Sequence, residues 1–96
     1  MTPLIVSCQP HDAGWTCAVT LGDDPAATHH QVEVEAADLK RLQPVAADPE
    51  ALVRAAFDFL LTREPRELIL RRFELSVIGR YFPEWEPEVA RRLAAG

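Results

Sequence analysis

The sequence has little of what usually marks a catalytic, membrane-spanning or metal-binding protein. Only four of its 96 residues are glycine, and it contains neither a glycine-rich phosphate loop nor the Gly-x-Ser-x-Gly motif of hydrolases. No apolar run approaches the roughly 20 residues that a membrane-spanning helix requires. The two cysteines lack the repeated close spacing of a zinc knuckle. We therefore expect a non-enzymatic protein with no cofactor, no bound metal and no membrane association.

Basic charge is also in short supply. The chain has 10 basic and 15 acidic residues, for a net charge of −5. Residues 1–49 hold seven acidic and two basic side chains, whereas residues 50–96 hold eight of each. A net-acidic protein gains nothing from the counterion release that drives non-specific binding to nucleic acids. This balance disfavours nucleic acid as a partner.

No targeting signal is visible at the start of the sequence. Residues 1–3 carry no basic side chain, and the apolar stretch at residues 4–6 is far shorter than the core of a signal peptide. We therefore expect a cytoplasmic protein. Because a disulfide is disfavoured in the cytoplasm, we expect Cys8 and Cys17 to be buried free thiols.

The first third of the chain predicts a three-stranded antiparallel β-meander. Large apolar residues alternate with small or polar ones over residues 15–21 and 31–36, the period of strands with one buried face, and residues 4–8 are β-branched at their centre. Opposite residues of an antiparallel pair share a face, so the register can be predicted. The expected pairs are Leu4 with Leu21, Val6 with Val19 and Cys8 with Cys17, then Leu21 with Val32 and Val19 with Val34.

The rest of the chain predicts helices that cover the apolar face of this sheet. Asp48 is a good N-cap, and Pro49 a good first residue, for a helix that continues to about residue 63. Its apolar face is wider than one sheet requires, so we expect it to lie between the sheet and the C-terminal segment. Other short helices are expected at residues 36–42, 65–73, 76–82 and 88–94.

Together these elements predict an α+β fold in one domain of residues 1–96. A β-meander over residues 1–36 is followed by a helical C-terminal half, residues 37–96, packed on one face of the sheet. A sheet of this kind cannot stand alone, because its apolar face needs a cover.

The stretch from residue 63 to residue 86 holds the only tyrosine and two of the eight prolines. Residues 69–84 read Ile-Leu-Arg-Arg-Phe-Glu-Leu-Ser-Val-Ile-Gly-Arg-Tyr-Phe-Pro-Glu, after Glu64 and Pro65. This run resembles the signature of a family of short bacterial proteins of uncharacterised function, in which a Glu-Pro pair leads into Ile-Leu-Arg-x-Phe-x-Leu-Ser-Val-Ile-x-Arg-Tyr-Phe-Pro-Glu. Gly79 and Trp85 stand where the family has a small polar residue and a tyrosine. The resemblance implies a small cytoplasmic domain with no known reaction.

Apolar residues in this stretch come in adjacent pairs, and adjacent helical residues point about 100° apart. One packing surface therefore buries only one set, for which we predict Ile69, Phe73, Ile78 and Phe82. The set that needs a second surface is Leu68, Leu70, Val77 and Tyr81. Arginine and aromatic residues are enriched in interface hot spots. We predict a contact surface for a protein partner, or for a second copy in a homodimer, made of Arg66, Arg71, Arg72, Arg80, Tyr81 and Trp85.

Two other interpretations of this stretch stay open. The arginines could form an ion-pair network on a helix surface, since Glu67 stands four residues before Arg71 and Glu84, Glu86 and Glu88 lie nearby. Residues 65–82 could instead form a helix-turn-helix that binds nucleic acid, although the second helix would be short and mostly apolar. A protein-interaction or regulatory module is the function we favour, with nucleic-acid binding as the alternative.

The histidines and cysteines suggest two further sites, both weakly. Thiolate and imidazole groups suit zinc, but Cys8, His11 and Cys17, with His29 and His30, do not have a known ligand spacing. His29 and His30 could form an acid–base pair, but the sequence places no nucleophile beside them. Neither pattern changes the expectation of a non-enzymatic protein.

Overall fold

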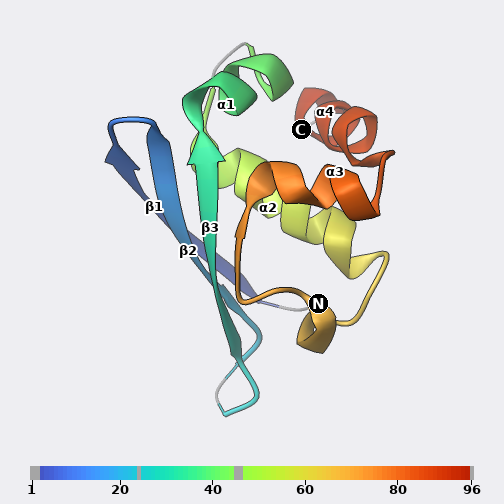
Figure 1. Ribbon diagram of the computed structural model, residues 1–96. Helices are drawn as coiled ribbons and strands as arrows, with labels where there is room; N and C mark the ends of the chain where they lie inside the picture. The colour runs from blue at the N-terminus through green and yellow to red at the C-terminus, as the bar shows by residue number, and fades with distance from the viewer. Residues whose placement is uncertain (1–2, 24, 45–46, 96) are drawn as a thin grey trace.

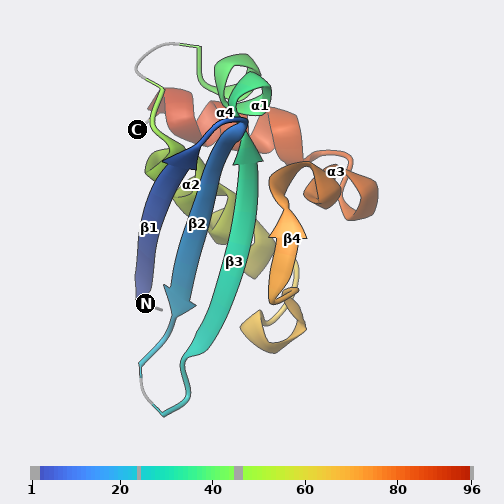
Figure 2. The same ribbon diagram turned by 60° about the vertical axis from the view of Figure 1, so that its left-hand side comes forward.

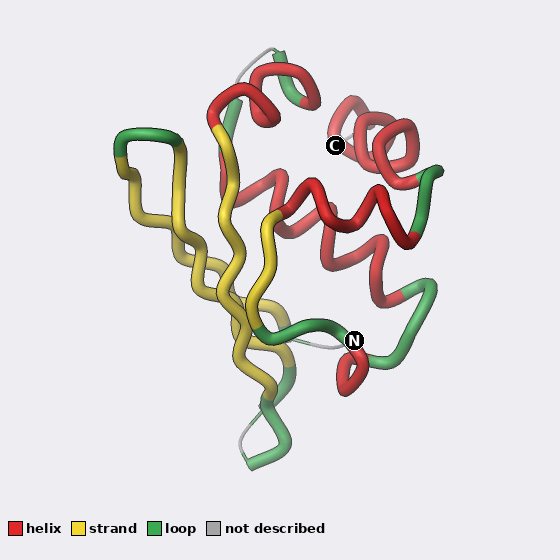
Figure 3. The backbone as a smooth tube through the Cα atoms, in the orientation of Figure 1, coloured by secondary structure: helices red, strands yellow, loops and turns green. Residues whose placement is uncertain are grey.

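The structure is a computed structural model that describes residues 3–23, 25–44 and 47–95. The described residues form a four-stranded sheet in the order β1-β2-β3-β4, with helices packed on one face (Figures 1 and 3). The elements are β1 (Leu4–His11), β2 (Gly14–Leu21), β3 (Thr28–Glu35), α1 (Ala36–Leu42), α2 (Pro49–Leu61), the 3-10 helix η1 (Arg66–Leu68), β4 (Arg72–Glu74), the 3-10 helix η2 (Leu75–Val77), α3 (Ile78–Tyr81) and α4 (Trp85–Ala95). The predicted α+β class is confirmed, but the sheet has a fourth strand that the sequence analysis did not predict.

The first hairpin has the predicted register. The observed pairs include Leu4 with Leu21, Val6 with Val19 and Cys8 with Cys17. The α-carbons of the two cysteines are 4.0 Å apart, and their sulfur atoms form a disulfide. The expectation of two free thiols is therefore wrong, because the register places the two side chains directly opposite each other on one face.

The second hairpin is shifted by four residues from the predicted register. Val34 lies opposite Trp15, and Val32 lies opposite Cys17, whereas the prediction placed both valines opposite residues four positions later in β2. A shift by an even number of residues keeps every side chain on its own face, so alternation alone does not distinguish the two registers. The predicted pairing is wrong, although the predicted inward face is right.

The observed register extends β3 backwards to Thr28, three residues before the predicted start. Thr28 lies opposite Leu21 and His30 lies opposite Val19, both on the face that the helices cover. His30 is only 4% exposed. A histidine that the sequence suggested as a weak metal or acid–base candidate is therefore a core residue.

The helix α2 begins as the sequence predicts. The side chain of Asp48 accepts a hydrogen bond of 3.0 Å from the backbone N–H of Glu50, and Pro49 is the first helical residue. A side-chain cap of this kind satisfies a backbone donor that the first turn leaves without a partner. The helix ends at Leu61, two residues before the predicted end.

Two phenylalanines of α2 show that the helix is buried on two sides. Phe57 packs edge-on against His30 of the sheet, with ring centroids 5.4 Å apart. Phe59 packs edge-on against Phe82 of the C-terminal segment, with centroids 5.9 Å apart. Both phenylalanines are fully buried. The predicted position of this helix, between the sheet and the C-terminal segment, is confirmed.

The strand β4 replaces the helix predicted over residues 65–73. It runs parallel to β3, with Phe73 opposite Val32, and the N–H of Gln31 donates to the carbonyl of Arg71 just before it. Parallel neighbours need a long connection, which α1 and α2 supply. The strand buries Phe73, and its backbone pairs with the edge of β3 that β2 leaves open. The helix-turn-helix considered for residues 65–82 is therefore wrong, because an extended strand separates the two helical turns.

The last helix starts at Trp85, three residues before the predicted start, and Trp85 is a core residue. Its indole is 1% exposed and lies against Gly79 of α3. Pro83 ends the preceding helical turn, so the chain reverses and α4 packs on α2. Trp85 therefore does not belong to an exposed contact surface, and its place in the predicted site is wrong.

One face of the sheet is not covered by any described helix (Figure 2). Its free edge is β1, where side chains of α2 bind the backbone: Arg54 Nη1 donates to the carbonyl of Leu4 at 2.8 Å, and the N–H of Cys8 donates to the carboxylate of Glu50 at 3.3 Å. These contacts occupy groups that would otherwise pair with another strand. No helix among the described residues is long and apolar enough to cross a membrane.

Candidate functional site

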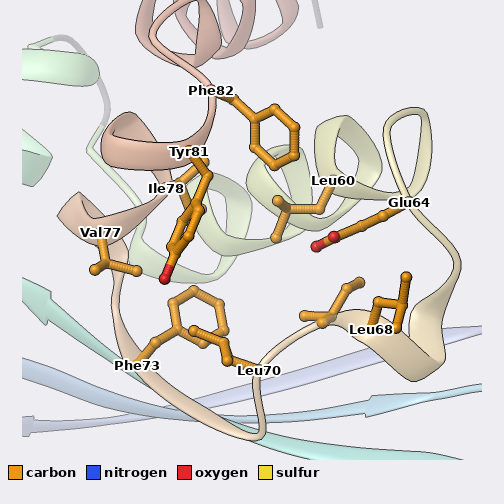
Figure 4. A pocket seen from close by; sticks show the side chains of 10 residues that line it. Leu60, Glu64, Leu68, Leu70, Phe73, Val77, Ile78, Tyr81 and Phe82 are labelled. Carbon is orange, nitrogen blue, oxygen red and sulfur yellow. The ribbon is translucent and has the colours of Figure 1, made fainter.

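The segment between α2 and α4 encloses an apolar groove with a cavity volume of about 180 Å³ (Figure 4). Its walls come from the end of α2, from η1 and the extended chain after it, from β4 and from α3. The lining residues are Leu60, Glu64, Leu68, Ile69, Leu70, Phe73, Val77, Ile78, Tyr81 and Phe82. Nine of these ten residues have apolar or aromatic side chains, so the groove is suited to an apolar occupant.

Six of the eight apolar residues that the sequence predicts to face two different surfaces are separated as expected. Ile69, Phe73 and Ile78 are buried and form the base of the groove. The exposed side chains of the other set are Leu68 at 65%, Leu70 at 48% and Tyr81 at 64%. Val77 and Phe82 are both half-buried. The exposed set therefore lines one groove instead of being scattered over the surface.

Among the residues that the structure describes, Glu64 is the single charged one that lines this groove. Figure 4 shows its carboxylate directed inward, between the side chains of Leu60 and Leu68. Its backbone N–H donates to the carbonyl of Leu60 at 2.9 Å, which holds the residue close to the end of α2. The next residue, Pro65, turns the chain into an extended conformation. This geometry presents one carboxylate to an otherwise apolar surface.

The neighbouring arginines are directed to other groups. Arg63 Nε lies 3.2 Å from a carboxylate oxygen of Glu84, and its guanidinium carbon lies 4.6 Å from the centre of the Phe59 ring. Arg66 Nε lies 3.7 Å from a carboxylate oxygen of Glu67. Among the described residues, no basic side chain forms an ion pair with Glu64.

The predicted arginine–aromatic surface is divided among several places. Tyr81 lines the groove, and Arg80 is exposed beside it on α3. Arg66 is half-buried, with its guanidinium against Gly22, whose φ of 88° is one that favours glycine. Trp85 lies in the core, as described above. Of the six predicted residues, therefore, only Tyr81 is among those that line the groove.

Arg71 and Arg72 lie on a different surface. Together with His29 and Gln31 they line a wide, open depression on the uncovered face of the sheet. The other lining residues are Ser7, Gln9, Thr16, Ala18 and His30. The helical pairing of Arg71 with Glu67 is wrong because the chain is not helical between these residues. The ion-pair interpretation holds in part, because Arg63 pairs with Glu84 and Arg66 with Glu67. Most of the residues that line this depression are polar, whereas the groove is lined mostly by apolar residues.

His30 connects the sheet to one wall of the groove. Its Nδ1 lies 2.7 Å from the carbonyl oxygen of Leu70, so Nδ1 carries the proton and donates to it. In the neutral ring Nε2 is then the acceptor for the hydroxyl of Thr28, at 2.9 Å. Burial lowers the pKa of His30, with a smaller lowering by the charges of Arg71 and His29, while the Leu70 hydrogen bond acts in the opposite direction. The neutral ring holds Leu70 in place.

The residues considered for zinc do not form a metal-binding group. Cys8 and Cys17 are bonded to each other, which removes the two thiolates of that set. His11 Nε2 lies 3.3 Å from Glu33, at the other end of the sheet from the Thr20–His29 hydrogen bond. Within the described part of the chain, no three His, Cys, Asp or Glu side chains are grouped so that they could hold a metal ion.

Sequence analysis missed Glu64 and His30 as parts of this site. Glu64 was noted only as half of the Glu-Pro pair, and the predicted helix after Pro65 hid the groove that its carboxylate enters. His30 was placed outside the third strand. A signal for His30 was present in the polar–apolar alternation before residue 31, where Thr28 and His30 continue the inward positions of Val32 and Val34.

Comparison with known proteins identifies no relative. No family model matches the chain, no curated protein matches it, and no solved structure matches it. The resemblance of residues 64–84 to a family of short bacterial proteins therefore stays a prediction.

Proposed function

We propose that this chain is a non-enzymatic protein-interaction module whose contact surface is the apolar groove. The observation that carries the proposal is the exposure of Leu68, Leu70 and Tyr81 around one cavity. Soluble proteins rarely expose several large apolar side chains together unless the patch binds something. Tyrosine is also one of the residue types enriched in interface hot spots.

The arrangement of the groove supports a contact with a protein segment. Its base is fixed by Ile69, Phe73 and Ile78, which pack into the core, so the groove exists before an occupant arrives. A preformed surface costs less ordering on binding than a flexible one. The occupant can be a partner protein or a second copy of this chain.

Nucleic-acid binding is the weaker function. The helix-turn-helix that suggested it is replaced by β4, and the groove presents a carboxylate, which repels phosphate. None of the described residues that line the groove is an arginine or a lysine, the residue types that neutralise a nucleic-acid backbone.

The proposal can be tested with a displayed library of random peptides of about 16 residues, selected on the wild-type protein. A double variant, Leu68→Ser with Tyr81→Ser, serves as the counter-screen, because both side chains are exposed and their loss leaves the core intact. We expect the selected peptides to be rich in apolar residues and to lose at least about tenfold in affinity for the variant, which corresponds to about 1.4 kcal/mol. Failure to select any peptide, or equal binding to both proteins, would contradict the proposal.

A further inference from the structure

Glu64 is the least explained group of the groove. Every other residue that lines the groove has an apolar or aromatic side chain, and several of these belong to the core. The carboxylate of Glu64 instead enters the cavity without a described ionic partner (Figure 4). Its neighbours Arg63 and Arg66 are engaged with Glu84 and Glu67. The positive charge that would complement this carboxylate is therefore not supplied by the residues beside it.

The position of Glu64 matters when the groove is filled. With the groove open, water solvates the half-buried carboxylate. An apolar occupant would displace that water and leave the charge with few partners, which costs free energy. An occupant that brings its own cation avoids this cost and forms a charge-assisted hydrogen bond.

We infer that the groove recognises an apolar segment of a partner protein that carries a lysine or arginine beside its apolar side chains. This inference rests on the proposed contact function of the groove. The apolar part packs between Leu68, Leu70 and Tyr81, and the cation pairs with Glu64. Anionic occupants such as fatty acids or phosphate esters are disfavoured by the same carboxylate.

Charge on the rest of the molecule is consistent with a cationic partner. The net charge is −5, so the protein attracts basic surfaces over a distance set by the ionic strength. Arg80 lies beside Tyr81 on α3 and reduces this attraction locally. The recognition of a cation therefore depends on contact with Glu64 in the groove, and variants at that residue provide the test.

The peptide library described above supplies the probe. It is selected in parallel on the wild-type protein, on Glu64→Gln and on the matched control Glu74→Gln. Glu74 is exposed on β4, does not line the groove, and forms no ion pair with a described residue. We expect groove-dependent peptides from the wild type and from Glu74→Gln to carry Lys or Arg at a fixed distance from their apolar residues, and those from Glu64→Gln to lack this enrichment.

A selected peptide then gives the quantitative result. Replacing its basic residue with glutamine should weaken binding to the wild type about fivefold or more, and should have little effect on binding to Glu64→Gln. Two results would overturn this inference and leave the proposed function intact. The first is a set of groove-dependent peptides that carry no basic residue. The second is an equal enrichment of Lys and Arg in the peptides selected on the wild type and on Glu64→Gln. Absence of any groove-dependent peptide, or self-association through the groove that Glu64→Gln does not weaken, would also overturn it.

Discussion

Trp85 and Gly79 are in direct contact, and the indole of Trp85 occupies the space that a side chain at position 79 would need. A Cβ atom built on Gly79 would lie 3.0 Å from Nε1 and 3.3 Å from Cδ1 of the Trp85 indole. The indole is 1% exposed, so it has little room to move away. The helix α3 therefore accepts a residue of low helix propensity because the first side chain of α4 packs against its backbone.

This contact predicts that a larger residue at position 79 destabilises the protein. Gly79→Val should lower the free energy of unfolding by about 1–3 kcal/mol, the range for overpacking a filled core. Arg80→Val is the matched control, since it places the same β-branched residue at an exposed position of the same helix and should cost less than about 1 kcal/mol. Chemical denaturation measures both. Equal losses for the two variants would mean that the Trp85 contact is not tight.

The sequence predicts the N-terminal half of this fold well because its signals are local. Alternation fixes the inward face of each strand, and Asp48 with Pro49 fixes the start of α2. Local signals do not predict the register of the second hairpin. A shift of four residues preserves the inward face, so only the turn length distinguishes the two registers. The position of His30 in the core depends on that register.

The site was harder to predict, because it depends on contacts between distant segments. Residues 65–73 have the apolar spacing of a helix, but burial of Phe73 against β3 favours an extended strand, a long-range effect that overrides local propensity. Once that segment is extended, Leu68 and Leu70 face the groove and Glu64 enters it. Trp85 lacked an evident partner in the sequence because Gly79 makes its contact through backbone atoms.

The disulfide predicts a stability that depends on redox conditions. Cys8 and Cys17 are separated by nine residues, and closing a loop of this size restricts the unfolded chain. Reduction should lower the free energy of unfolding by about 2–3 kcal/mol, measured by denaturation with and without a reductant. The double variant Cys8→Ala with Cys17→Ala should not respond to the reductant. A wild-type protein that is equally stable under both conditions would show that the bond does not form in solution.

His30 predicts a loss of stability at mildly acidic pH. Burial holds the pKa of His30 below the value of about 6.5 expected in the unfolded chain. The unfolded state therefore binds a proton more readily, so the stability due to neutral His30 is fully present above about pH 6.5 and is lost as the pH falls through the lower folded pKa. Denaturation between pH 5 and pH 8 should show this slope in the wild type.

Two variants separate His30 from the other titrating groups. His30→Gln should be less stable at neutral pH but should lack this part of the pH dependence, while His29→Gln, which alters an exposed histidine of the same strand, should keep it. If His30→Gln has the wild-type slope, another group is responsible and the burial of His30 does not control the pH response.

The central claim is that the groove between α2 and α3 is the contact surface, and amide chemical shifts measured by NMR test it most directly. A peptide selected on the wild-type protein is titrated into the isotopically labelled protein. We predict shifts concentrated at residues 64–70 and 77–82, around Glu64, Leu68 and Tyr81, with little change on the open face of the sheet. Shifts concentrated instead at His29, Gln31 and the other residues of that open face would contradict the account.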